Sequence, residues 1–163
     1  MEKLNKIAVL GALVLALLAP LGEGRAQAPD SLVSFDRDQI TIETAAGGSH
    51  VFEVELAITP EQRSQGLMFR HSMPADAGML FLFERSEQRA MWMKNTLIPL
   101  DMLFIDEGGV IVRIHARSVP FSLQAIASGQ PVIAVLELNA GTSARLSIKP
   151  GDRVLHGAFE SGS

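Results

Sequence analysis

The sequence predicts a compact, mainly β domain of the α+β class. We expect a mostly antiparallel barrel or sandwich of roughly seven or eight short strands with two short helices. Segments in which apolar and polar residues alternate recur along the chain, and glycine-rich turns separate them. Two continuous apolar segments, residues 79–83 and 102–105, are typical of strands buried on both faces. Only two places carry the start and stop signals of helices, and both predicted helices are short.

Residues 1–28 are predicted to be a cleaved secretory signal peptide. Lys3 and Lys6 precede an apolar segment at residues 7–18, and residues 26–28 have the small-residue pattern of a cleavage site. The apolar segment is shorter than the roughly 20 residues that cross a bilayer, so an uncleaved anchor is the weaker alternative. The protein is therefore expected to be periplasmic or secreted.

The remaining chain is predicted to form one domain. Its expected parts are a leader with the first strand (29–50), a single β-rich domain (51–156) and a tail (157–163). From residue 29 on there are 11 Lys and Arg against 16 Asp and Glu, a net charge of about −5, and no cysteine for a disulfide or a lipid anchor. No cluster of basic and aromatic residues indicates nucleic-acid binding, and attraction to an anionic membrane is no better supported. We expect a monomer or weak oligomer without a stable membrane span.

The predicted strands alternate with turns. They cover residues 40–44, 52–58, 79–83, 90–94, 102–105, 110–117, 132–138 and 153–156. The first two form a hairpin around a glycine turn, and residues 106–109 form a second tight hairpin turn. The charged residues 84–88 are predicted to be a solvated turn, and Pro99 interrupts any strand ladder near it because proline donates no hydrogen bond. Residues 119–129 are expected to be irregular.

Both predicted helices have recognisable ends. Thr-Pro-Glu-Gln at residues 59–62 is a capping box with proline at the first helical position, and Gly66 is the stop signal. This helix of about two turns is too short to be stable alone and must dock on the sheet. Asn139 or Thr142 is expected to cap the second helix, over residues 144–148.

Several motifs in one order carry a resemblance to a known family. They are EQRSQGLMFR at 61–70, GMLF at 78–81, WMKNT at 92–96, IPLD at 98–101, FID at 104–106 with Gly109, LELNAG at 136–141 and PGDR at 150–153. With them the chain resembles, over residues 51–154, a bacterial and archaeal family named domain of unknown function 192. The departure is Met91, where the family usually has an aromatic residue beside the tryptophan. The resemblance implies a compact β-rich fold and frequent export, and it implies no established activity.

Polar residues within and near the apolar stretch 78–106 predict a binding site. The candidate ligand-binding residues are Arg63, Arg70, Trp92, Lys94, Asn95, Asp101 and Glu137. Because arginine binds carboxylate or phosphate through two parallel hydrogen bonds, we expect an anionic or sugar-like ligand or an envelope component at a polar patch around residues 94–101. The structural alternative is that either arginine pairs with Asp101 or Glu137. We also expect the helix that carries Arg63 to lie beside residues 92–101.

Two other interpretations remain open at this stage. Asp101 and Glu137 are a candidate acid–base pair for a hydrolase or lyase acting on cell-envelope polymers, so the sequence does not decide whether the protein is an enzyme. As a minor alternative, thioethers bind Cu(I), and six methionines lie between residues 68 and 102. Methionine is also ordinary core filling, which we favour. No cofactor and no metal site are predicted, and no catalytic residue is assigned.

Overall fold

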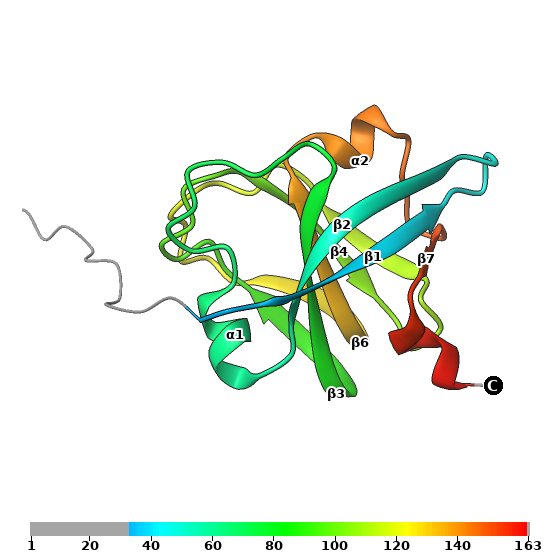
Figure 1. Cartoon of the computed structure of the whole chain (residues 1–163), viewed down its shortest axis with the longest axis horizontal. Helices are drawn as coiled ribbons and strands as arrows, with labels where there is room; N and C mark the ends of the chain where they lie inside the picture. Colours follow the sequence, from blue (N-terminus) through cyan, green and yellow to red (C-terminus); the bar gives the residue numbers. More distant parts are fainter. Residues whose placement is uncertain (1–32, 163) are drawn as a thin grey trace, which may run out of the picture.

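The computed structural model describes residues 33–162, and the strands in that range form one mixed sheet (Figure 1). The strands are β1 (Asp36–Glu43), β2 (Ser49–Ala57), β3 (Ala77–Met91), β4 (Leu100–Ile105), β5 (Ile111–His115), β6 (Ile126–Asn139) and β7 (Arg153–Leu155). The helices are α1 (Pro60–Gln65), α2 (Thr142–Arg145) and the 3-10 helix η1 (Gly157–Gly162). The predicted signal peptide lies outside the described residues. No helix within 33–162 is long and apolar enough to cross a membrane.

The sheet curls into a nearly closed barrel. Its seven strands have the order β5-β4-β6-β3-β2-β1-β7, and only β2 and β3 pair in parallel. The two outer strands meet through a bridge between Val110 and Arg153 and through a 2.7 Å hydrogen bond from the Val154 N–H to the Gly109 carbonyl. Because the backbones of the two outer strands are hydrogen-bonded across this seam, the sheet closes on itself. Of the two predicted architectures, barrel and sandwich, the structure is therefore the barrel.

The central strands are apolar on both faces. Leu80, Leu103 and Leu136 contribute to one core cluster together with side chains of β1, β2 and β7. Their chain neighbours, such as Met79 and Met102, contribute to a second cluster on the other face, which the segment after α1 and the loop after β3 cover. Because successive strand residues point to opposite faces, this double burial requires the continuous apolar segments seen in the sequence. The two strands predicted to be buried on both faces are confirmed.

The course of β3 differs from the prediction. Residues 84–88 are not a turn, because β3 continues through them to Met91. Of the strand predicted at 90–94, only residues 90 and 91 belong to β3, and residues 92–94 lie in the loop that follows it. Its register against β6 shifts twice, between Leu82 and Glu87 and between Gln88 and Ala90. Such bulges bend a strand and leave residues outside the ladder, which accommodates a charged segment without ending the strand. The same pairing makes β6 begin earlier than predicted, at Ile126.

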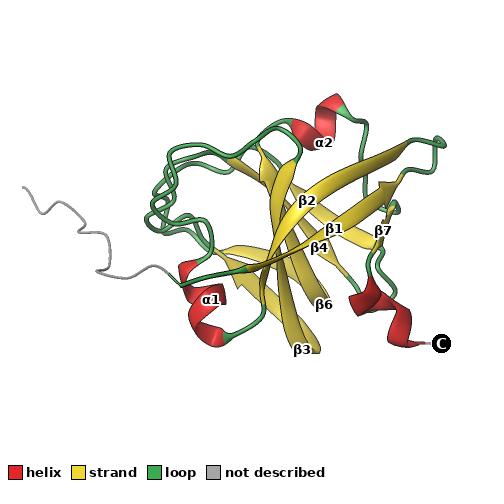
Figure 2. Cartoon of the chain, in the orientation of Figure 1, coloured by secondary structure: helices red, strands yellow, loops and turns green. Residues whose placement is uncertain are grey.

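The two short helices lie at the periphery of the sheet (Figure 2). At α1 the predicted capping box is present, since Thr59 Oγ1 accepts the Gln62 N–H at 3.2 Å and the Gln62 side chain accepts the Thr59 N–H at 3.0 Å. The helix ends at Gly66, as predicted.

The prediction for the second helix was wrong in both its cap and its range. α2 follows Gly141 in a left-handed conformation (φ 86°), without a side-chain cap from its own segment. The Asn139 side chain instead donates to the carbonyls of Met73 and Pro74. The carboxylate of Asp101, on β4, receives the N–H groups at the start of this helix, so a capping residue in the helix itself is not required.

Candidate functional site

A cleft of about 380 Å³ opens between α1 and the outer half of β3. Its lining residues come from α1 and the segment after it, from β3 and the loop that follows, and from β6: Pro60, Arg63, Ser64, Gln65, Gly66, Leu67, Met68, Phe81, Phe83, Gln88, Arg89, Ala90, Met91, Trp92, Thr96 and Glu137. Three of the seven predicted site residues, Arg63, Trp92 and Glu137, therefore line one cavity. The helix that carries Arg63 was expected beside residues 92–101, and it does lie beside the first part of this segment, Trp92 to Thr96, but not beside Asp101.

Glu137 is the acidic residue of the cleft lining. It lies directly opposite Met79 on β3 and Met102 on β4, so its side chain shares the face of the second apolar cluster. Glu137 is only 4% exposed, and no hydrogen bond reaches its carboxyl group from the described residues. Burial raises the pKa of Glu137 to about 8. At neutral pH this carboxyl is therefore mostly protonated and has an O–H to donate.

Arg63 forms one wall of the cleft. Its Nη1 donates to the backbone carbonyls of Ile58 and Leu82, the latter at 3.1 Å. Its guanidinium also lies 5.4 Å from the centre of the Phe83 ring, within the range of a cation–π contact. These contacts fix the guanidinium between α1 and β3. The alternative in which Arg63 pairs with Asp101 or Glu137 is wrong, because its Nη1 donates to backbone carbonyls instead.

Arg89 is the lining residue that the sequence analysis missed. Its guanidinium lies 4.3 Å from the Phe83 ring, its Nη2 donates to the Arg85 carbonyl at 2.8 Å, and the same atom lies 3.4 Å from Glu87. Its Nε is buried without a hydrogen-bond partner among the described residues. The signal that could have found Arg89 is its place directly before the apolar residues 90–93, but it lay between the predicted turn at 84–88 and the predicted strand at 90–94.

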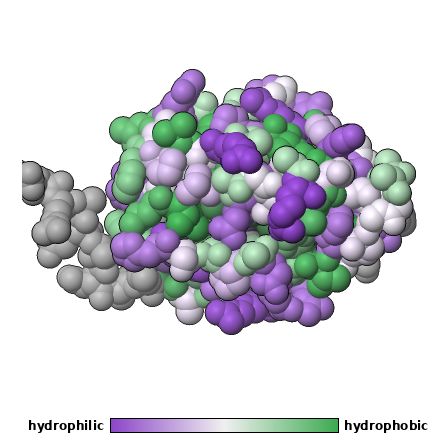
Figure 3. All heavy atoms as spheres, turned by 90° about the horizontal axis from the view of Figure 1, so that it is seen from above, coloured by the Kyte–Doolittle hydropathy of each residue, from purple (hydrophilic) through white to green (hydrophobic). Residues whose placement is uncertain are grey.

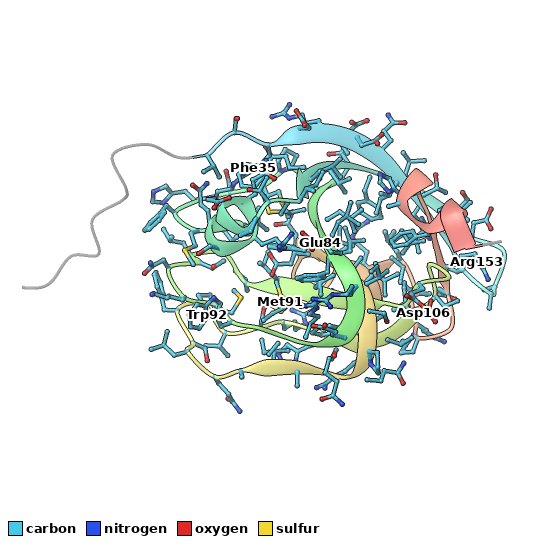
Figure 4. The ribbon with its side chains drawn as sticks, turned by 90° about the horizontal axis from the view of Figure 1, so that it is seen from below. Phe35, Glu84, Met91, Trp92, Asp106 and Arg153 are labelled. Carbon is cyan, nitrogen blue, oxygen red and sulfur yellow. The ribbon has the colours of Figure 1, made fainter. Side chains whose placement is uncertain are left out.

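Trp92 forms the outer lip of the cleft. Trp92 is 52% exposed, and the Lys94 ammonium lies 5.3 Å from its ring. In Figure 4, Trp92 lies at the loop-rich end of the molecule, at the opposite end from Asp106 and Arg153. Asn95 lies beside the cleft in a left-handed turn (φ 54°), where its carbonyl accepts the Phe69 N–H at 2.9 Å. Lys94 and Asn95 thus border the cleft without lining it.

Asp101 does not reach the cleft. It lies between Leu100 and Met102, both of the second cluster, so its side chain points to the opposite face of the sheet from Glu137. Its carboxylate accepts the N–H groups of Arg117 (2.9 Å), Gly141 (3.0 Å) and Ser143 (2.9 Å), together with the Ser143 hydroxyl. Burial by itself would raise the pKa of Asp101, but these hydrogen bonds outweigh it and lower the pKa below its usual value.

Arg70 is also outside the cleft. It forms an ion pair with Glu55 and lies 5.7 Å from the Phe35 ring. It lines a separate hollow of about 280 Å³, which shares no residue with the main cleft. Neither arginine pairs with Asp101 or Glu137, so the predicted ion pairs are not formed.

Five of the six described methionines belong to the second apolar cluster or pack against it, and Met68 lines the cleft. Met79, Met93 and Met102 are fully buried in the second cluster, and Met73 and Met91 pack against it. Residues 33–162 contain no group of three or more histidine or acidic side chains placed to hold a metal.

These features define a small β-barrel domain with a lateral cleft whose buried acid has no hydrogen-bond partner in the part of the chain that the structure describes. Comparison with known proteins identifies the family: residues 41–156 match DUF192, described as "uncharacterized ACR". The chain belongs to this family, as its motifs indicated. No curated protein matches it in sequence.

Two solved structures are similar to this chain. One, from Sinorhizobium meliloti 1021, carries a provisional description as a transcription regulator. It is 49% identical with a TM-score of 0.76, over 78% of this chain and 99% of that one. The other, from Novosphingobium aromaticivorans DSM 12444, is a protein of unknown function. It is 37% identical with a TM-score of 0.73, over 82% of this chain and 95% of that one.

Proposed function

We propose that this protein binds a small anionic or sugar-like ligand in the cleft between α1 and β3, without chemical conversion of the ligand. The observation that carries the proposal is Glu137, a buried carboxyl that lines the cleft and has no hydrogen-bond partner among the described residues. The raised pKa of this carboxyl shows that its burial disfavours the charged form, and no charge or hydrogen bond of the fold compensates. Since Met79 and Met102 flank this position, an apolar residue would fit it at lower cost. A ligand that forms hydrogen bonds with Glu137 would account for an acidic residue at this buried position.

The other polar groups of the cleft indicate the ligand's chemistry. The unpartnered Nε of Arg89 is a second group that a ligand oxygen would satisfy, and the guanidinium of Arg63 adds positive charge. With Glu137 protonated, the cleft favours an anionic oxygen, to which the neutral acid donates. Trp92 and Phe83 supply ring faces for the apolar side of a sugar ring.

The proposal moves the site away from the polar patch predicted at residues 94–101. Within that patch, Thr96 lines the cleft and Lys94 lies next to Trp92 at the rim, whereas Asp101 is assigned to the barrel's internal hydrogen bonding. A free small molecule and the end of an envelope polymer both offer the required oxygens. The predicted export of the chain favours the envelope source.

Trp92 is the only tryptophan of the chain and provides a direct test. We would titrate the mature chain, residues 29–163, with D-glucuronate, D-galacturonate and glucose 1-phosphate and follow Trp92 fluorescence. Glucose, which lacks the negative charge, and acetate, which lacks the sugar ring, serve as controls. A saturable change for at least one anionic sugar, lost in Glu137→Leu and kept in the surface control Glu107→Gln, is expected. If no anionic sugar shifts the fluorescence or the amide NMR signals of residues 63–68 and 88–92, the proposal fails.

A hydrolase or lyase is the second candidate, and the raised pKa of Glu137 favours it, because a carboxyl protonated at neutral pH can act as a general acid. The two-carboxylate mechanism considered from the sequence is not available, since Asp101 and Glu137 point to opposite faces of the sheet. Incubation with envelope glycans, followed by measurement of new reducing ends, separates the candidates. Turnover by the wild type that is lost in Glu137→Gln would replace binding with catalysis.

A further inference from the structure

The loop-rich end of the barrel carries an exposed apolar patch beside the cleft. Trp92 comes from the loop after β3, whereas Val119, Phe121 and Leu123 come from the loop after β5, and each of the four is more than half exposed. We call these four residues the loop patch. Two backbone hydrogen bonds join the loops: the Met93 N–H donates to the Ser122 carbonyl at 3.0 Å, and the Phe121 N–H donates to the Thr96 carbonyl at 3.2 Å.

The loop patch is a built feature of the fold. Phe121 has a left-handed backbone (φ 61°), which is uncommon for a bulky residue and is maintained here by the link between the loops. Large apolar side chains that gather on one surface mark an interaction site more often than scattered ones do. In Figure 3, hydrophobic and hydrophilic side chains lie side by side at this end of the molecule.

The charged residues of the two segments that carry the loop patch have one sign. Residues 88–100 and 108–136 contain four cationic side chains, Arg89, Lys94, Arg113 and Arg117, and no acidic residue. Of these, Lys94, Arg113 and Arg117 are exposed, and none of the three forms an ion pair within the described part of the chain. The chain as a whole has a net charge of −4. The two loops that form the patch, with the strand ends beside them, therefore carry only positive charge in an otherwise acidic protein.

We propose that the loop patch docks on an anionic lipid bilayer. Exposed apolar side chains enter the interfacial region of a bilayer, tryptophan is enriched at that depth, and flanking Lys and Arg are attracted to anionic headgroups. The absence of acidic residues from both segments fits an anionic surface. This surface could not be predicted from the sequence, because its residues are spread over two separate loops and meet only in the fold.

Docking would also orient the cleft. Because Trp92 belongs to both the loop patch and the cleft lining, a bilayer in contact with the patch would lie next to the cleft opening. This proposal goes beyond ligand binding in the cleft and does not depend on it, since the patch residues other than Trp92 are not part of the cleft lining.

The test uses the mature chain, residues 29–163, which contains the whole barrel and lacks the apolar segment of the predicted signal peptide. Vesicles of phosphatidylcholine mixed with phosphatidylglycerol are compared with vesicles of phosphatidylcholine alone, by flotation and by Trp92 emission. We expect binding to the anionic vesicles, a blue shift of Trp92 emission and release at high salt. The double variant Phe121→Ser/Leu123→Ser should bind about tenfold more weakly or worse.

The matched control is Val51→Ser, which removes an exposed apolar side chain from β2 outside the loop patch and should leave vesicle binding unchanged. Circular dichroism of all variants verifies the fold. The proposal is overturned if the wild type does not bind anionic vesicles, or if the double variant binds them as well as the wild type does. A concentration-dependent dimer that the double variant abolishes, without vesicle binding, would instead make the patch an interface between two copies.

Discussion

Two buried carboxyl groups on neighbouring strands have opposite environments. Asp101 on β4 lies opposite Leu138, and Glu137, the residue before Leu138 on β6, lies opposite Met102. Asp101 accepts three backbone N–H groups and a serine hydroxyl, whereas Glu137 has no protein partner among the described residues. The pKa of Asp101 is consequently lowered and that of Glu137 raised. One step along a strand thus separates a carboxylate that stabilises the barrel from an acid that destabilises it.

The difference follows from what each face of the sheet meets. On the Asp101 side, the chain turns through Gly141 into α2, and the free N–H groups at the helix start point at the carboxylate. On the Glu137 side lie methionine side chains and the cleft, and none of the residues 33–162 donates a hydrogen bond to this carboxyl. A carboxylate whose hydrogen bonds the fold satisfies, such as Asp101, has a structural role. A carboxyl group whose hydrogen bonds the fold does not satisfy, such as Glu137, indicates a function, because an apolar residue at the same position would favour folding more.

The largest expected effect is the loss of stability in Asp101→Ala. Removing the carboxylate leaves three backbone N–H groups unpaired in the interior, so we expect the free energy of unfolding to fall by about 4 kcal/mol. Urea unfolding at pH 7 measures it, and Asp76→Asn, an exposed carboxylate, is the control that should change little. A loss below about 1 kcal/mol would show that the barrel does not depend on this cluster.

The lowered pKa of Asp101 also predicts acid sensitivity. Its stabilisation is present above the pKa of the unfolded state, near 4, and is lost as the pH falls through the lower pKa of the folded state. The wild type should therefore lose stability in that acidic range more steeply than Asp101→Ala does.

Glu137→Gln should act in the opposite direction. In the wild type the unfolded chain ionises Glu137 above about pH 4.5, whereas the folded protein keeps it neutral up to about pH 8. Stability therefore declines between these two pH values, and the cost at pH 7 is about 3 kcal/mol. Glutamine does not ionise, so the variant should be more stable by about this amount at pH 7 and no more stable at pH 4. Unfolding measured at both pH values gives the answer, and equal stability of the two proteins at pH 7 would contradict the buried, raised-pKa environment.

Ligand binding should report the same ionisation. Above pH 8 Glu137 is ionised, and its negative charge repels an anionic ligand. The affinity for that ligand should therefore fall up to about tenfold per pH unit beyond that point. Titration of Trp92 fluorescence with the anionic sugar that binds at pH 7 measures this. In Glu137→Gln the residual binding should be independent of pH from 7 to 9. A wild-type affinity that stays constant over this range would remove Glu137 from the binding site.

The contrast between the two acids also explains what could be predicted from the sequence. The hairpins, the capping box and the doubly buried strands follow from local patterns, and these predictions are confirmed. Glu137 was a candidate because an acid in an apolar strand is conspicuous. The two carboxylates could not be distinguished, because the partners of Asp101 lie 16 to 42 residues away in the sequence. Only the fold brings those donors to one carboxylate and none to the other.

The cleft was harder to predict than the barrel. Arg89 escaped notice because the bulges of β3 have no clear sequence signal, so a charged segment within a strand resembled a turn. Arg70 was included because it is polar and close to the α1 motif, yet it pairs with Glu55 in a different hollow. Local patterns determine strands and caps, whereas a site depends on register and on long-range contacts.

The smallest expected effect concerns the cap of α1, which positions Arg63 in the cleft wall. Thr59→Ala removes the hydrogen bond to the Gln62 N–H, which should reduce the free energy of unfolding by about 1 kcal/mol. Because α1 has only six residues and no fully buried side chain, this loss should be local and should loosen the cleft wall more than the barrel. Amide hydrogen exchange measures the difference: faster exchange is expected in residues 60–66, with β4 and β6 unchanged. Thr59→Ser, which keeps the capping hydroxyl, is the matched control. Equal acceleration in β4 would mean that α1 and the barrel unfold as one unit, and the cleft would then be as rigid as the Asp101 side of the sheet.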